Sequence, residues 1–192
     1  YSPNFYSYKY EEGDLAADVI DEEKIVNLLN WANNDLWSNR KNLGSQAKDS
    51  CYNFYYNKTA KRVEMLMSQI NKKDDSDLIN GTLIPSVEDL MSSINEGLLL
   101  NEWLGHFHGD FILDNILVTS SGFKLIDWRQ DFDGSIEYGD VYYDLAKLNH
   151  NLFFNHHNIH SGLYDIVESG ECILVDLKIN YRLLQVKLDT ET

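Results

Sequence analysis

The stretch covering residues 106–128 constrains the fold of this chain more than any other part of it. Two apolar runs, at positions 116–118 and 123–126, flank a short polar turn that contains Gly122. Apolar runs joined by such a turn are typical of a β-hairpin, which brings its two ends together. The sequence therefore predicts that the residue before the first strand lies beside the residue after the second.

Polar residues stand at both ends of this predicted hairpin. Asn115 precedes the first strand, Asp127 follows the second, and Asp110 lies on the loop that leads into the hairpin, directly after His108 and Gly109. Mg²⁺ prefers oxygen ligands and usually takes one or two carboxylates together with phosphate oxygens and water. The spacing predicts a site in which a metal ion binds a phosphate and one carboxylate remains free to act as a base. Taken singly, each of the three is better explained as a turn or capping residue.

The ordered set of motifs resembles the catalytic and metal-binding loops of the protein-kinase-like fold. The residues within these motifs are most similar to those of the aminoglycoside phosphotransferase and choline kinase family. The resemblance is carried by His108-Gly109-Asp110, Asn115-Ile116-Leu117, Ile126-Asp127-Trp128, Gly139-Asp140 and Tyr143-Asp144-Leu145-Ala146.

The resemblance implies an α+β fold that is mainly helical, the C-terminal (large) lobe of a kinase-like fold with a catalytic β-hairpin. Residues 1–18 are then the hinge and the end of the small lobe, and residues 19–192 are the large lobe. Tyr8 and Tyr10 lie in the aromatic segment near the start. The resemblance implies that this segment passes beside the adenine, so the two tyrosines would bind the cofactor. The sequence contains no recognisable glycine-rich phosphate loop and no strand lysine with a partnering helix glutamate, so most of the small lobe is expected to be missing.

The same resemblance assigns roles to the central residues and implies ATP and Mg²⁺ as cofactors. Asp110 would accept or orient the proton of an attacking hydroxyl, and His108 would belong to the catalytic loop as a brace. Asn115 and Asp127 would hold Mg²⁺ on the nucleotide phosphates.

Two further carboxylates are expected to support this loop. Asp144 stands among apolar neighbours, where a carboxylate costs free energy unless it is hydrogen-bonded. The resemblance implies that it accepts hydrogen bonds from the catalytic-loop backbone. Asp140 is expected to cap the start of the following helix.

These features predict an enzyme, a small-molecule kinase that transfers phosphate from ATP to a hydroxyl of a sugar, an amino alcohol such as choline, or an aminoglycoside. The residues around Arg129 and Lys147 resemble those of bacterial kinases of surface-polysaccharide metabolism, which favours a sugar as the phosphate acceptor. An alternative is a pseudokinase or regulatory binding module without catalysis. Phosphorylation of proteins is disfavoured because the motif reads His-Gly-Asp and no Ala-Pro-Glu follows Asp127.

Composition excludes several other classes. The net charge of −15 and the absence of a basic run argue against nucleic-acid binding. Two distant cysteines outside any metal-ligand spacing favour a cytoplasmic chain. No apolar run reaches membrane-spanning length.

Four histidines between His150 and His160 are interpreted as a surface or substrate-facing cluster rather than a zinc site. The oligomeric state is left open.

Hydrophobic periodicity predicts helices over 18–38, 50–70 and 138–154, and a helix capped by Ser86 that stops at Gly97. Residues 71–80 are expected to form a charged linker and residues 163–168 a short helix. Residues 171–177 are interpreted as a strand or the start of a buried helix. Together these segments predict one lobe of helices around a hairpin rather than two domains.

Overall fold

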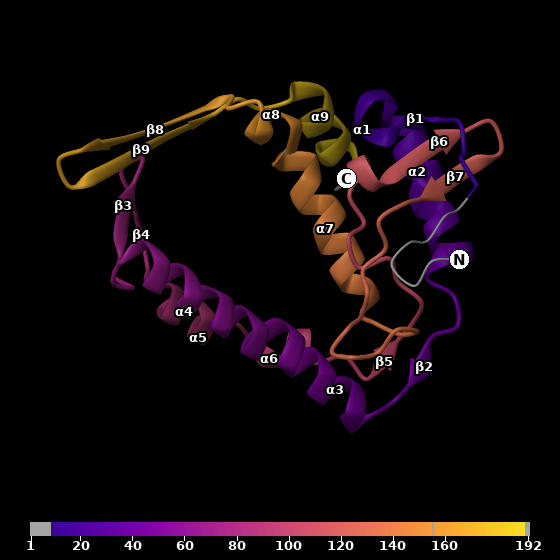
Figure 1. Ribbon diagram of the computed structural model, residues 1–192, viewed down its shortest axis with the longest axis horizontal. Helices are drawn as coiled ribbons and strands as arrows, with labels where there is room; N and C mark the ends of the chain where they lie inside the picture. The colour runs from indigo at the N-terminus through magenta and orange to yellow at the C-terminus, as the bar shows by residue number, and fades with distance from the viewer. Residues whose placement is uncertain (1–8, 155, 191–192) are drawn as a thin grey trace, which may run out of the picture.

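The computed structural model describes residues 9–154 and 156–190, and it has a mixed α+β fold (Figure 1). The predicted hairpin is present as β6 (Ile116–Thr119) and β7 (Gly122–Leu125), with Ile116 opposite Leu125. A short strand, β1 (Asp14–Leu15), pairs with the other edge of β6, so the sheet order is β1-β6-β7. The hairpin is thus held on one side by the N-terminal segment.

The helix expected over 18–38 is broken into shorter pieces. These are α1 (Ala16–Val19), α2 (Glu22–Trp31) and the π-helical turn η1 (Ala32–Leu36). The break comes at Asp21, whose side chain caps α2 by accepting a hydrogen bond from Lys24 N at 2.8 Å.

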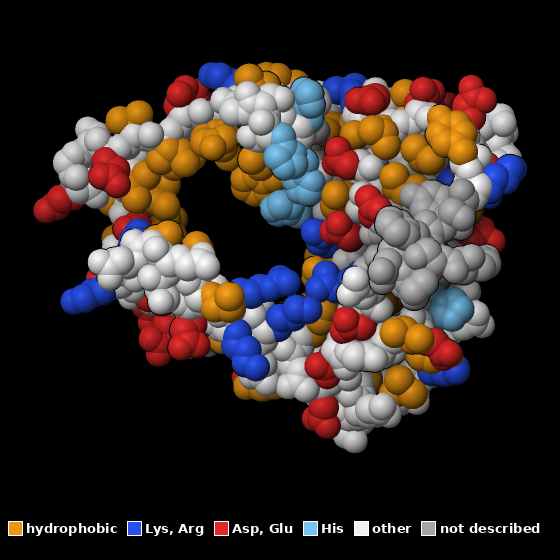
Figure 2. Space-filling view, in the orientation of Figure 1, with side chains coloured by type: hydrophobic (Ala, Val, Ile, Leu, Met, Phe, Trp, Pro, Cys, Tyr) orange, Lys and Arg blue, Asp and Glu red, His pale blue; other side chains and the backbone are white. Residues whose placement is uncertain are grey.

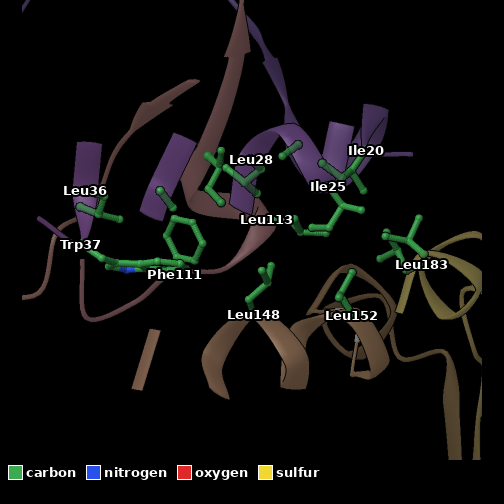
Figure 3. Packing of buried hydrophobic residues seen from close by; sticks show 14 of the residues in the cluster. Ile20, Ile25, Leu28, Leu36, Trp37, Phe111, Leu113, Leu148, Leu152 and Leu183 are labelled. Atoms are coloured by element: carbon green, nitrogen blue, oxygen red, sulfur yellow. The ribbon is translucent and has the colours of Figure 1, made fainter. Parts of the chain in front are cut away.

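The hydrophobic core lies between α2, α7 (Val141–Phe153) and α9 (Tyr181–Thr190), and the loop at residues 107–113 runs through it (Figure 3). Phe111 and Leu113, from that loop, are completely buried. The core therefore fixes the loop between two layers of helices. The labelled core side chains are Ile20, Ile25, Leu28, Leu36, Trp37, Phe111, Leu113, Leu148, Leu152 and Leu183.

A long helical arm leaves this body (Figure 1). It consists of α3 (Ser45–Tyr52), the π-helical segment η2 (Asn53–Asn57) and α4 (Lys58–Ile70), so the helix predicted over 50–70 is present and begins earlier. Its base is tied to the body by β2 (Lys41–Asn42), which pairs with β5 (Trp103–Leu104).

Short helices complete the body and the arm. Ser86 caps α5 (Val87–Ser93) as predicted, accepting from Asp89 N at 3.0 Å. The predicted stop at Gly97 is wrong, because α5 ends earlier and Gly97 lies inside a separate turn, α6 (Glu96–Leu99). The remaining helical turns are η3 (Leu113–Asn115), directly before the hairpin, and α8 (His156–His160).

A second sheet corrects two expectations. Its strands are β3 (Asp77–Ile79), β4 (Thr82–Ile84), β8 (Tyr164–Ser169) and β9 (Cys172–Leu177), in the order β4-β3-β9-β8. Part of the expected linker at 71–80 is therefore a strand, and the helix expected at 163–168 is also a strand. β8 is exposed along its whole length, so no buried face gives its sequence the alternation of a half-buried strand.

This second sheet joins the far end of the arm back to the C-terminal part of the body. β3 pairs in parallel with β9, with Leu78 opposite Cys172, and the Asn80 side chain bonds both backbone groups of Val175. The space-filling view shows an opening enclosed by arm, sheet and body (Figure 2). Within residues 9–154 and 156–190, no helix has both the length and the apolar character needed to cross a membrane.

Candidate active site

Asp144 holds the loop that carries Asp110. Its carboxylate, fully buried on α7, accepts hydrogen bonds from His108 N at 2.7 Å, Gly109 N at 2.6 Å and the Trp37 indole at 3.0 Å. Burial raises the pKa of this carboxyl, and the three hydrogen bonds oppose that rise because they favour the ionised form. The expected contact between Asp144 and the loop backbone is present.

His108 connects the loop to the end of the hairpin. Its ring is completely buried, with Nε2 2.8 Å from Ile126 O and Nδ1 accepting from Asp110 N at 3.2 Å. Since a carbonyl oxygen only accepts, Nε2 carries the proton and Nδ1 is the acceptor. Both ring nitrogens are thus occupied by the backbone, which suits the predicted bracing role.

Asn115 orients the carboxylate of Asp110. The amide Nδ2 donates to Asp110 O at 3.0 Å and to Asp110 Oδ2 at 3.1 Å. The carboxamide oxygen, the atom that ligates cations, points the opposite way from Nδ2 because the group is planar. Asp110 itself is partly exposed on the loop.

Asp127 lies beside Asn115, as the hairpin predicts. Ile126 N donates to Asn115 O at 3.0 Å, so the residue after Ile126 is placed at the mouth of the loop. The backbone of Asp127 is left-handed, with φ of 56°, a region that few side chains other than Asn and Asp adopt readily. This conformation ends the strand abruptly and leaves the carboxylate exposed to solvent. Asn115 is thus bonded both to Asp110 and to Ile126, the residue that precedes Asp127.

A cavity of about 780 Å³ opens beside Asp127, a size that suits a nucleotide. Leu117, Leu125 and Ile126 give it an apolar wall. Tyr10, predicted to bind the cofactor, lines the cavity and is 84% exposed, whereas Tyr8 lies outside the described residues. Trp128 also lines it and is 53% exposed, which gives the cavity two aromatic faces.

Asp140 caps α7 and fixes the base of the arm. Its carboxylate accepts from Tyr142 N at 3.1 Å, from the Tyr55 hydroxyl at 2.9 Å and from Asn101 Nδ2 at 3.3 Å. Burial raises the pKa of Asp140, and the hydrogen bond from Tyr55 is the largest opposing effect. Burial also raises the pKa of the Tyr55 phenol, so Tyr55 remains the donor.

Lys147 is the residue that sequence reasoning missed. Its ammonium lies 2.7 Å from Asp110 Oδ1, on the side of the carboxylate away from Asn115. A signal existed, because Lys147 is three residues after Asp144 and therefore stands on the same face of α7.

The histidine cluster lies near this cation. Burial lowers the pKa of His150, and the charges of Lys147 and His156 lower it further. His156 Nδ1 is 4.0 Å from Asp114 Oδ2. Figure 2 shows histidines gathered along one rim of the opening.

Among the described residues, no three His, Cys, Asp or Glu side chains are grouped closely enough to hold a metal ion. The Asn115 amide oxygen and the Asp127 carboxylate would not form such a group, because only one of the two is a carboxylate. In a site of that kind, phosphate oxygens and water supply the remaining ligands. No protein-family model, curated protein or solved structure matches this chain.

Proposed function

We propose that this chain is the large lobe of a kinase-like phosphotransferase that acts on a hydroxyl of a small molecule. The observation that supports this most is that one loop and the hairpin after it carry Asp110, Asn115 and Asp127, with Asp127 lining a nucleotide-sized cavity. A loop base, an amide and a second carboxylate are groups that phosphoryl transfer uses. On this proposal the chain belongs to the aminoglycoside phosphotransferase and choline kinase family.

The residues present fit Mg²⁺ and ATP. Asn115 and Asp127 offer an amide oxygen and a carboxylate, a ligand set that Mg²⁺ accepts when phosphate oxygens and water complete it. Tyr10 and Trp128 offer aromatic faces for the base, over the apolar wall of the cavity. When bound, ATP supplies the γ-phosphoryl group, and Mg²⁺ neutralises charge on its phosphates.

The chain's own groups would then position the acceptor and handle its proton. Asp110 accepts the proton of the acceptor hydroxyl, while Asn115 and Lys147 fix the orientation of its two carboxylate oxygens. His108 and Asp144 keep the loop rigid, which matters because a misplaced base loses much of its effect.

The alternative is a pseudokinase or binding module without catalysis. The absence of a recognisable glycine-rich loop from the sequence favours it. Against it stands the detailed support of Asp110, since a non-catalytic lobe needs neither a rigid loop base nor a metal pair beside it. Metal-independent nucleotide binding would favour this alternative.

The test is a calorimetric titration of Mg·ATP into the chain, with Asp127→Asn as the variant. Asn tolerates the left-handed backbone at this position, so the fold is kept while the carboxylate charge is lost. Asp133→Asn is the matched control, because Asp133 is also exposed and also left-handed, with φ of 49°.

We expect binding that requires Mg²⁺, is retained in Asp133→Asn and is lost in Asp127→Asn. The proposal fails if the wild-type chain does not bind, or if Asp127→Asn binds Mg·ATP as tightly as the wild type.

A further inference from the structure

Cationic side chains gather at the rim of the opening, although the chain as a whole carries a net charge of −15 (Figure 2). Three members of this patch stand close together on α4 of the arm, at positions 58, 61 and 62, and the tertiary fold adds one from the loop after the hairpin and one from α7. We call it the basic rim, and its members are Lys58, Lys61, Arg62, Arg129 and Lys147.

Two of these cations share one aromatic ring. The Lys58 ammonium lies 4.8 Å and the Arg129 guanidinium 4.9 Å from the centre of the Phe54 ring, which is itself almost fully buried. Arg129 is further held by Tyr143, whose ring centre is 5.6 Å away, and by a hydrogen bond from Nε to Asp131 O at 3.1 Å. Stacked cations of this kind are positioned in advance for an anion.

The rim cations also repel one another. Burial lowers the pKa of Lys58, and the neighbouring charges of Arg129 and Arg62 lower it further. Asp131 and Asp133 raise it, by less than burial and the two guanidinium groups lower it.

The nearby carboxylates are engaged elsewhere. Asp131 Oδ1 accepts from Gly134 N at 2.9 Å, and Asp133 Oδ2 accepts from Asn53 Nδ2 at 3.2 Å. Within residues 9–154 and 156–190, Lys58, Lys61, Arg62 and Arg129 form no ion pair with a carboxylate. Lysines at other places, such as Lys24 and Lys48, do form them.

The basic rim borders the proposed base on two sides. Lys147 is paired with Asp110, and Arg129 packs against the residue before it. A Cβ added to Gly109 would stand 2.5 Å from the Arg129 Cβ, so the absence of a side chain there is what allows the contact. An acceptor that presents its hydroxyl to Asp110 therefore lies next to Lys147 and close to the Arg129 side chain.

We propose that the acceptor is itself an anion, a sugar-like hydroxyl compound that carries a carboxylate or a phosphate. This inference rests on the proposed function, and it selects among the acceptors that the sequence leaves open. A choline or aminoglycoside cation is repelled by the basic rim, whereas an anionic group finds a guanidinium and ammonium groups ready to bind it.

The test measures the binding of four probes to the full chain at 0.15 M salt, without nucleotide. The probes are glucuronate, glucose 6-phosphate, neutral glucose and choline, so the carboxylate and the phosphate are separated from the sugar ring. The variant is Lys58→Gln combined with Arg62→Gln. The control combines Lys24→Gln with Lys178→Gln, which removes the same charge outside the rim.

We expect at least one anionic probe to bind about tenfold more tightly than glucose and choline, as one or two charge-assisted hydrogen bonds would give. That preference should be lost in the rim variant and kept in the control. Absence of any preference for anions, or a preference that survives in the rim variant, overturns the inference.

The probe that binds is then titrated again with saturating Mg·ATP present. Displacement of the probe by Mg·ATP would assign the basic rim to the nucleotide phosphates and would also overturn the inference. Anion binding at the rim in a chain that binds no Mg·ATP would instead refute the proposed function and leave the rim as an anion site.

Discussion

Replacing Asp144 by alanine tests the idea that one buried carboxylate holds the loop of His108 and Gly109 in place. The variant removes the acceptor of three hydrogen bonds, from the backbone of His108 and Gly109 and from the Trp37 indole. The site is completely buried, so water does not readily replace the lost oxygen atoms. The three donors are left without a partner.

The magnitude follows from these contacts. Hydrogen bonds to a charged acceptor contribute roughly 1.5–3 kcal/mol each, and the burial of the carboxylate costs several kcal/mol that the variant recovers. Removing one partner of such a buried network usually costs about 3–5 kcal/mol in total. Because domains of this size unfold with a free energy of about 5–15 kcal/mol, the variant is expected to lose a large part of its stability.

Urea unfolding gives the free energy of unfolding, and amide hydrogen exchange reports the loop directly. We expect a loss of about 3–5 kcal/mol, with faster exchange of the Gly109 amide than global unfolding explains. Asp165→Ala, at an exposed position on β8, should change the stability by less than about 0.5 kcal/mol. A loss below about 1 kcal/mol in Asp144→Ala, with Gly109 still protected, would refute the reasoning.

Other predictions follow from the same loop and from the arm. Gly109→Ala should destabilise the chain by about 1–3 kcal/mol in urea unfolding, because φ is +80° there and the new Cβ would stand 2.8 Å from the Phe107 ring; unchanged stability would contradict this. The free-energy difference between the wild type and Asp144→Asn should fall as pH rises above 3.8. A buried acid with a raised pKa contributes stability below that ordinary value and loses it as pH rises through the folded-state pKa; a difference that grows with pH over pH 3.5–7 would be incompatible with this. Ser86→Ala should lower stability by about 1 kcal/mol through the loss of the cap on Asp89 N, and Ser86→Thr should largely restore it.

The hairpin of β6 and β7 was predictable because its signal is local. The turn at Gly122 and the apolar runs beside it determine the register, which places Ile126 opposite Asn115 and Asp127 one residue beyond. The caps at Ser86 and Asp140 were predictable for the same reason, since each depends on residues within three positions. In each of these cases the residues that make the contact lie close together in the sequence.

The second sheet and the complete basic rim were not predictable, because β3 and β9, and Arg129 and Lys58, meet only through the tertiary fold. β8 is exposed on both faces and leaves no alternation to read, and the parallel partner of β3 lies on the far side of residues 106–128 in the chain. Arg129 and Lys58 likewise meet only because Phe54 lies between them. Hydrophobic periodicity describes one helix or strand at a time, so it does not predict contacts between elements that are distant in the sequence.

The parallel pairing of β3 with β9 has a consequence for the order in which the chain folds. The loop that it closes, from Leu78 to Cys172, contains the loop of His108 and Gly109, the hairpin and α7. Contacts between residues so distant in sequence form slowly, because the entropy of closing the loop is lost before the pairing compensates for it. We therefore expect the hairpin and its helices to reach their native packing first, with the ring around the opening closing in the last step of folding.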